Sequence, residues 1–191
     1  MDDAIRDYLA RTGVAQVEEA CLAVASPVRG TQVRMTNNHW RFDSEVVRQQ
    51  FGWTAFKVIN DFTAMALGVL HVTEDRLVAV CGGEGNPARP RLVMGPGTGM
   101  GVSGLIPTNT GRLPLMTEGG HVDYAPTDDL EVASLGILPR FLHFFLESNF
   151  QHGFEDKGRM RPLLEATPVF VVTEKYTGLL GAAEALRNPE V

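Results

Sequence analysis

Cysteine is scarce in this sequence, in which Cys21 and Cys81 are the only two among 191 residues. Both lie within apolar runs and they are far apart, so the sequence offers neither a disulfide framework nor a Cys-x-x-Cys metal site. A chain with so few cysteines suits a reducing compartment, and we therefore expect a cytoplasmic protein.

Basic residues and long apolar runs are also few. The formal net charge is -6, from 17 Lys and Arg against 23 Asp and Glu, so the chain lacks the positive field that nucleic-acid binding requires. No apolar run reaches the ~18 residues of a membrane span, and the acidic start Met1-Asp2-Asp3 differs from the basic start of a signal peptide. We expect neither nucleic acid nor a membrane as a partner, and no secretion.

The composition is that of a globular protein, with 44% hydrophobic and 21% charged residues. Residues 20–25 form a continuous apolar run, and residues 56–59, which read Phe-Lys-Val-Ile, repeat the pattern. Both lie between helical segments, which predicts strands buried on both faces and hence an α/β sheet. Shorter strands are expected at 77–81, 91–94 and 101–106, separated by turns rich in Gly and Pro. These three strands are expected to form a second, more antiparallel sheet.

Residues 95–101 read Gly-Pro-Gly-Thr-Gly-Met-Gly. No lysine follows, and Met100 replaces the third glycine of Gly-x-Gly-x-x-Gly, so two common nucleotide motifs are excluded. The missing side chains let backbone amides approach a phosphate, and Thr98 adds a hydroxyl donor. A plain glycine-rich turn between Val93 and Val102 explains the same pattern, and the loop alone does not decide between the two.

Asn60 and Asp61 follow directly after the second expected buried strand. Ligands of open α/β sheets bind outside the carboxyl ends of strands, so both side chains are expected to face a crevice. A carboxylate there can accept the proton of a substrate hydroxyl as its oxygen attacks a phosphoryl group, and an asparagine can bind further hydroxyls. The alternative is that one of the two caps a helix that begins near Thr63.

Residues 118–121 read Glu-Gly-Gly-His. The Glu118 carboxylate and the His121 imidazole can both reach one polyhydroxylated ligand, because the first accepts hydrogen bonds and the second donates or accepts. A metal site is a rival, but no further His or Cys stands at ligand spacing, so we expect no metal. A Gly-Gly turn flanked by solvated polar side chains is the structural alternative.

Four segments, taken in order, resemble the bacterial glucokinase family: Met35-Thr36-Asn37, residues 59–64, residues 95–101 and residues 118–126. The resemblance covers nearly the whole chain. It implies an α/β, actin-like ATPase (ribonuclease H-like) two-domain fold, in truncated form. It also implies phosphorylation of glucose at its 6-hydroxyl, a glycolytic reaction, with ATP and Mg²⁺ in the cleft between the domains. A kinase for another hexose and a non-catalytic sugar-binding remnant are the alternatives.

The resemblance also assigns individual residues. It makes Asp61 the general base. Three residues are expected to bind glucose hydroxyls: Asn60, Glu118 and His121. Four are expected to contact ATP: Gly97, Thr98 and Gly99 in a phosphate loop, and Gly136 in the adenosine-binding loop. The expected domains are residues 1–71 (small, α/β), 72–177 (large, α+β) and 178–191, a C-terminal helix that returns to the small domain. Members of the family are commonly homodimers, so a homodimer is expected as well.

The sequence departs from the family pattern in two places. The family opens with a β-hairpin that carries its first phosphate loop and a magnesium-placing aspartate, whereas this chain begins at the helix that follows. Residues 131–134 then run directly into residues 135–139, where the family has a long helical segment. That segment contributes a further glucose-binding glutamate and much of the wall on the nucleotide side. We therefore expect little or no kinase activity from this chain alone, and an unpaired sheet edge beside residues 20–25.

Overall fold

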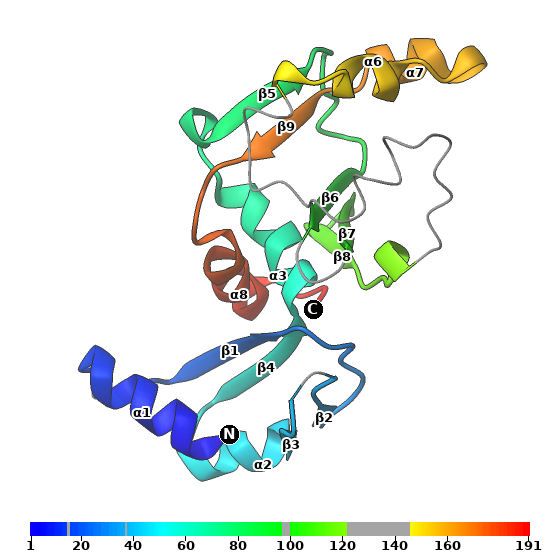
Figure 1. Ribbon diagram of the computed structural model, residues 1–191. Coiled ribbons are helices and arrows are strands. Elements are labelled where there is room, and N and C mark those ends of the chain that lie inside the picture. Colours follow the sequence, from blue (N-terminus) through cyan, green and yellow to red (C-terminus); the bar gives the residue numbers. More distant parts are fainter. Residues whose placement is uncertain (15, 37, 97–99, 122–145) are drawn as a thin grey trace.

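The computed structural model describes residues 1–191 except 15, 37, 97–99 and 122–145 (Figure 1). The helices are α1 (Asp2–Thr12), α2 (Ser44–Phe51), α3 (Asp61–Gly68), α6 (Phe150–Glu155), α7 (Arg161–Glu165) and α8 (Thr177–Arg187). The strands are β1 (Glu19–Val24), β2 (Gln32–Arg34), β3 (Arg41–Asp43), β4 (Ala55–Asn60), β5 (Leu77–Cys81), β6 (Arg91–Pro96), β7 (Met100–Pro107), β8 (Arg112–Leu115) and β9 (Val169–Val172). None of the described helices combines the length and the apolarity that crossing a bilayer requires.

The two strands expected at residues 20–25 and 56–59 are confirmed as β1 and β4, which pair in parallel. Their expected burial on both faces is wrong, since only Val24 and Ile59 are buried and most of the other residues are partly exposed. Their register places Val24 opposite Asn60, so both strands end at the same edge. A parallel pair needs a crossover, which here contains the hairpin β2–β3 and helix α2. The polar residues that follow β1 and β4 are thereby brought to one place.

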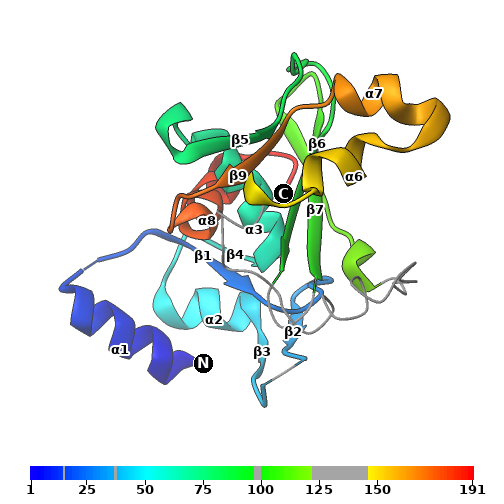
Figure 2. The same ribbon diagram turned by 45° about the horizontal axis from the view of Figure 1, so that its top comes forward.

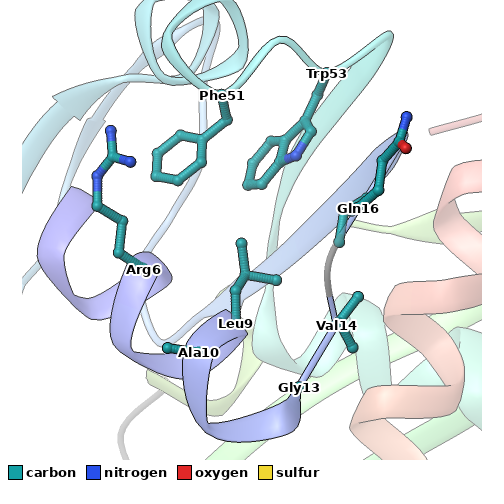
Figure 3. Close-up of a pocket in the computed structure, with 9 residues that line it drawn as sticks. Arg6, Leu9, Ala10, Gly13, Val14, Gln16, Phe51 and Trp53 are labelled. Atoms are coloured by element: carbon teal, nitrogen blue, oxygen red, sulfur yellow. The ribbon is translucent and has the colours of Figure 1, made fainter.

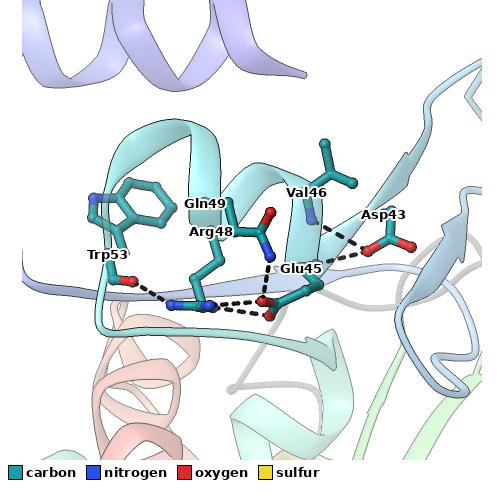
Figure 4. Close-up of polar contacts among 6 residues, drawn as sticks. All are labelled: Asp43, Glu45, Val46, Arg48, Gln49 and Trp53. Carbon is teal, nitrogen blue, oxygen red and sulfur yellow. Dashed lines mark hydrogen bonds and ion pairs between the residues drawn. The ribbon is translucent and has the colours of Figure 1, made fainter.

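Helix α2 is joined by side-chain hydrogen bonds to the turn that precedes β4 (Figure 4). The Asp43 carboxylate caps the helix, since it accepts hydrogen bonds from the backbone N–H groups of Glu45 (2.8 Å) and Val46 (3.3 Å). At the other end, the Arg48 guanidinium donates to the Trp53 carbonyl oxygen at 2.8 Å. Hydrogen bonds from Arg48 to the Glu45 carboxylate lower the pKa of Glu45 to about 2. Arg48 thus ties both ends of α2 to the turn that leads into β4.

The second sheet is only partly as the sequence predicts. β6, β7 and β8 form an antiparallel sheet, which confirms the strands expected at 91–94 and 101–106. The strand expected at 77–81 exists as β5, but it pairs antiparallel with β9, so its expected place beside β6 and β7 is wrong. β9 lies about ninety residues further along the chain, and its Val171 is the partner of Val78. A pairing between such distant segments leaves no signal in local sequence patterns.

Helix α3 is the centre of the molecule (Figure 2). It lies between α8 on one side and the sheet β6–β7–β8 on the other. The hydrophobic core gathers on this helix and consists of Ile59, Ala64, Ala66, Leu67, Leu105 and Ala185. Because α3 is apolar nearly all round, it is stable only when it is covered on all sides.

Helices α3 and α8 approach each other more closely than side chains allow. A Cβ atom added at Gly68 would fall on the Thr177 carbonyl oxygen, and one added at Gly181 would fall on the Ala64 carbonyl oxygen. Lys57 of β4 fixes the end of α8, since its ammonium donates to the carbonyl oxygens of Ala185 (2.8 Å) and Asn188 (3.3 Å). The position of α3 therefore depends on Gly68 and Gly181, because a side chain at either residue would push the two helices apart.

Substitution of Gly181 tests this crossing. Gly181→Ala should lower the free energy of unfolding by about 1–3 kcal/mol, because the helices must separate to admit the new methyl group. Gly153→Ala in α6 is the matched control, since a Cβ there meets open space and alanine is favoured in a helix by up to ~1 kcal/mol. Denaturant unfolding of both variants measures the difference, and an equal response would contradict the close crossing.

One edge of β1 is covered by no other described strand. β1 pairs with β4 alone among the described strands, and its residues Ala20 to Val24 include no lysine or proline of the kind that protects an exposed edge. We expect the chain to self-associate with rising concentration, and Ala20→Lys to reduce that association. Size-exclusion chromatography with light scattering measures it. A monomer at every concentration, with one sharp unfolding transition, would contradict this expectation.

Candidate functional site

Asn60 stands at the carboxyl end of β4 and caps helix α3. Its Oδ1 accepts hydrogen bonds from the backbone N–H groups of Phe62 (2.9 Å) and Thr63 (3.3 Å). The capping alternative is therefore correct for this residue, and the helix begins at Asp61 rather than near Thr63. The Asn60 Nδ2 donates to the Ser26 carbonyl oxygen at 3.5 Å, and among the described residues its second amide hydrogen has no acceptor.

Asp61 is the first residue of α3 and is half-buried. One of its oxygens, Oδ1, accepts a hydrogen bond from the backbone N–H of Phe62 at 2.9 Å. The other oxygen, Oδ2, makes no hydrogen bond or ion pair within the part of the chain that the structure describes. A negative charge is favourable at the N-terminus of a helix. Asp61 thus offers one oxygen that can accept a proton from a ligand hydroxyl.

Ser26 connects the first resembling segment to Asn60, and the sequence reasoning missed it. This residue follows β1, is only 3% exposed, and its Oγ accepts a hydrogen bond from the Thr36 backbone N–H at 2.7 Å. Its hydroxyl donates to the Thr36 Oγ1 at 3.1 Å, while its carbonyl oxygen accepts from Asn60. The sequence does contain a signal for this contact, because Ser26 follows one apolar strand and Asn60 ends the other. Asn37 lies outside the described residues.

The glycine-rich segment lies beside the start of α3. Gly95 of β6 and Gly101 of β7 are partners in the hairpin, and the ring of Phe62, the residue after Asp61, packs against both. Residues 97–99, which the resemblance assigns to a phosphate, lie outside the described residues. Their role therefore stays a prediction.

The segment from Glu118 to His121 lies against the same hairpin. Gly120 approaches the Met100 carbonyl oxygen so closely that an added Cβ would fall on it. The turn is closed locally, because the Thr117 Oγ1 accepts a hydrogen bond from the Gly119 backbone N–H at 3.0 Å. Glu118 is exposed. The backbone of His121 ends this short helical turn, and its side chain is outside what the structure describes.

The structure thus brings the four resembling segments together through successive contacts. Thr36 reaches Asn60 through Ser26, Phe62 reaches the glycine pair 95 and 101, and Met100 reaches Gly120. These contacts surround the N-terminal end of α3, where Asn60 and Asp61 lie. Gly136 lies outside the described residues, so nothing here bears on its expected contact with adenosine.

Two hollows of the described surface lie away from this end of α3. One, of about 530 Å³, separates α1 from the turn between α2 and β4 (Figure 3). Phe51 and Trp53 stack there at 4.8 Å between ring centroids, and the Arg6 guanidinium lies 4.8 Å above the Phe51 ring. No carboxylate lines this groove, so it holds no candidate for a general base. The second, of about 380 Å³, has three carboxylates in its lining, Asp2, Asp3 and Asp43, and that of Asp43 caps α2.

Thiol and metal chemistry find little support in the described part of the chain. Burial raises the pKa of the Cys21 thiol to about 11, against a smaller opposite effect of Lys57, and burial raises the pKa of Cys81 as well. Both thiols therefore stay protonated near neutral pH, and a protonated thiol is a poor nucleophile. No three His, Cys, Asp or Glu side chains of the described residues gather closely enough to hold a metal ion.

A family profile, two sequence relatives and a solved structure that match this chain all belong to glucokinases. The sequence profile of the Glucokinase family matches residues 1–135 and 132–189. The glucokinases of Marinobacter nauticus and Hahella chejuensis are 48% and 41% identical to this chain over 279 residues, covering 100% of this chain and 87% of each relative. The crystal structure of a glucokinase from an Antarctic psychrotroph matches with a TM-score of 0.81 and 25% identity, covering 98% of this chain and 86% of that one.

The two profile matches meet at residues 132–135, and the alignments span 279 residues against the 191 of this chain. The relatives therefore contain a long internal segment that this chain lacks, at the position where the sequence predicts the loss. The structural match confirms the expected α/β fold of the actin-like ATPase type, in truncated form. This chain belongs to the glucokinase family of hexose kinases.

Proposed function

We propose that the N-terminal end of α3 binds glucose and that Asp61 is the general base for its phosphorylation by ATP. The observation that supports this most directly is the Oδ2 of Asp61, which makes no hydrogen bond to the described residues. It lies beside Asn60, at the carboxyl ends of the parallel strands β1 and β4. Ligands of α/β folds bind at such an edge. Family membership supplies the substrate class, because glucokinases transfer a phosphoryl group from ATP to glucose.

In the proposed reaction, the 6-hydroxyl oxygen of glucose attacks the γ-phosphorus of ATP while its proton passes to the Oδ2 of Asp61. A bond forms between that oxygen and phosphorus. The bond from phosphorus to the bridging oxygen of the β-phosphate breaks, and ADP leaves with the electron pair. Glucose 6-phosphate is the product, and Asp61 later releases its proton to water.

Three further side chains are proposed to hold the sugar. Asn60 donates its remaining amide hydrogen to a glucose hydroxyl, since its Oδ1 is occupied by the cap of α3. Glu118, whose carboxylate is exposed beside the hairpin, accepts from a second hydroxyl. His121 is proposed as a third contact because it completes the segment that resembles the family.

ATP is proposed to bind as its magnesium complex on the opposite side of the cleft. Mg²⁺ is commonly held by substrate phosphates together with one or two carboxylates. The described residues contain no cluster of three ligating side chains, so we assign no residue to the ion. The proposed nucleotide contacts are Gly97, Thr98, Gly99 and Gly136.

The cleft is proposed to lie between residues 1–71 and 72–177. The C-terminal segment, 178–191, is proposed to return to the smaller of these domains, and the contacts of α8 with β1 and β4 support that assignment. We place the reaction in the cytoplasm, where Cys21 and Cys81 stay reduced.

A second candidate function is the binding of glucose without phosphorylation. The internal segment that the relatives contain near residues 132–135 favours it, because the resemblance places a further glucose-binding glutamate and much of the nucleotide wall there. Phosphoryl transfer depends on positioning and on neutralising charge around the phosphates. A site that keeps Asn60 and Asp61 but lacks this wall is suited to hold the sugar rather than to transfer phosphate to it.

Turnover separates the two functions. We expect this chain to form glucose 6-phosphate at least ~10²-fold more slowly than the Marinobacter nauticus glucokinase assayed beside it, because the internal segment proposed to form much of the nucleotide wall is missing. Any remaining turnover should disappear in Asp61→Asn, which keeps the shape of the side chain but removes the base. The rate is measured by coupling glucose 6-phosphate formation to its dehydrogenase.

Asp75→Asn is the matched control for this experiment. Asp75 is exposed and lies in the short helical turn Glu74–Arg76, away from α3, so its substitution should leave the rate unchanged. A rate equal to that of the Marinobacter relative would contradict the expected loss of activity. Turnover that survives in Asp61→Asn would contradict the role of Asp61 as the base.

A further inference from the structure

Two of the glycines between residues 95 and 101 face each other across the hairpin. Gly95 of β6 and Gly101 of β7 are cross-strand partners. Glycine weakens a strand, since it loses more conformational freedom on folding and offers no side chain to pack. A pair of opposed glycines therefore indicates that another group needs the space where their side chains would be.

That space is filled by the ring of Phe62. A Cβ added at Gly95 would lie 2.9 Å from the Cζ of Phe62, and one added at Gly101 would fall directly on the ring, nearest its Cε2. An aromatic ring over glycines of a sheet supplies the packing that the glycines lack. We call this arrangement, formed by Phe62, Gly95 and Gly101, the Phe62 slot.

The slot joins two elements that the proposed reaction requires. Phe62 follows Asp61 in the first turn of α3, and its backbone N–H donates to the side chains of both Asn60 and Asp61 at 2.9 Å. Its ring, in contrast, is held by the hairpin β6–β7. α8 fixes the other flank of α3, through Gly181 and Ala64. The orientation of the first turn of α3 relative to the hairpin therefore depends on the ring of Phe62.

We infer that Phe62 is a positioning residue: its ring, seated between Gly95 and Gly101, fixes the N-terminal turn of α3 against the hairpin β6–β7 and thereby sets the place of Asn60 and Asp61. This inference rests on the proposed function for the effect on glucose. It gives Gly95 and Gly101 a role distinct from phosphate binding, because they receive a ring of the protein itself.

The position of the base matters because misplacement by about 1 Å can reduce a reaction ~10²-fold. A side chain at Gly101 has no free space and must displace the ring. The displaced ring moves the backbone N–H of Phe62 and, with it, the two side chains that accept its hydrogen bonds. A small substitution in the hairpin is thus transmitted to the site through one residue.

A double-mutant comparison tests the slot. Gly101→Ala should lower the melting temperature by about 5 °C or more in the natural background, since overpacking is destabilising, and by much less when combined with Phe62→Ala. Gly104→Ala on the same strand is the matched control. Its added Cβ would meet Arg91 and Leu115 but not Phe62, so its effect should be the same in both backgrounds.

Glucose affinity, measured by calorimetry on the same variants at a temperature where each is folded, tests the positioning role. Gly101→Ala should weaken glucose binding about tenfold or more in the natural background and not further in the Phe62→Ala background. Phe62→Leu, which fills part of the slot, should retain more affinity than Phe62→Ala.

If Gly101→Ala lowers the melting temperature equally in both backgrounds, the ring of Phe62 is not packed against Gly101 and the inference is wrong. If the effect of Gly101→Ala on the melting temperature depends on Phe62 but glucose affinity is unchanged, the positioning role is contradicted. If the unsubstituted chain binds no glucose, the proposed function fails, and the melting temperatures still decide whether the slot exists.

Discussion

The close approach of backbones around α3 is the constraint on which the rest of this structure depends. Gly68 and Gly181 let α8 reach the helix on one side, and Gly95 and Gly101 leave room for the ring of Phe62 on the other. The helix is apolar nearly all round, so it gains its stability from these neighbours rather than from solvent-exposed pairs. Its N-terminal end is consequently placed by packing, and the polar residues there follow.

Because packing places this end of α3, the two polar side chains there, Asn60 and Asp61, are already oriented by hydrogen bonds within the protein. Asn60 uses its oxygen to cap the helix and half of its donor capacity on Ser26, and its second amide hydrogen has no acceptor among the described residues. Asp61 uses one oxygen on the backbone, and its other oxygen makes no hydrogen bond to the described residues. These hydrogen bonds restrict the orientation of each side chain, so each has little freedom to lose if it binds glucose as we propose.

The sequence predicts the outline of the fold well and the details of packing poorly. Short, mainly apolar segments located β1 and β4, and the four segments that resemble the family indicated it. The pairing of β5 with β9 could not be predicted, because it joins residues far apart in the chain. Ser26 was missed for the same reason, and Gly95 and Gly101 looked like members of a phosphate loop because only the structure places Phe62 between them. In each case the missing information was a contact between segments that are distant in sequence.

Glucose bound at the N-terminal end of α3 would change the backbone amide resonances of that turn. The backbone N–H groups of Phe62 and Thr63 donate to the very side chains proposed to bind the sugar. In a ¹⁵N-labelled chain titrated with glucose, we expect these two amides to shift most. Unchanged Phe62 and Thr63 resonances at saturating glucose, or shifts confined to the groove around Trp53, would contradict it.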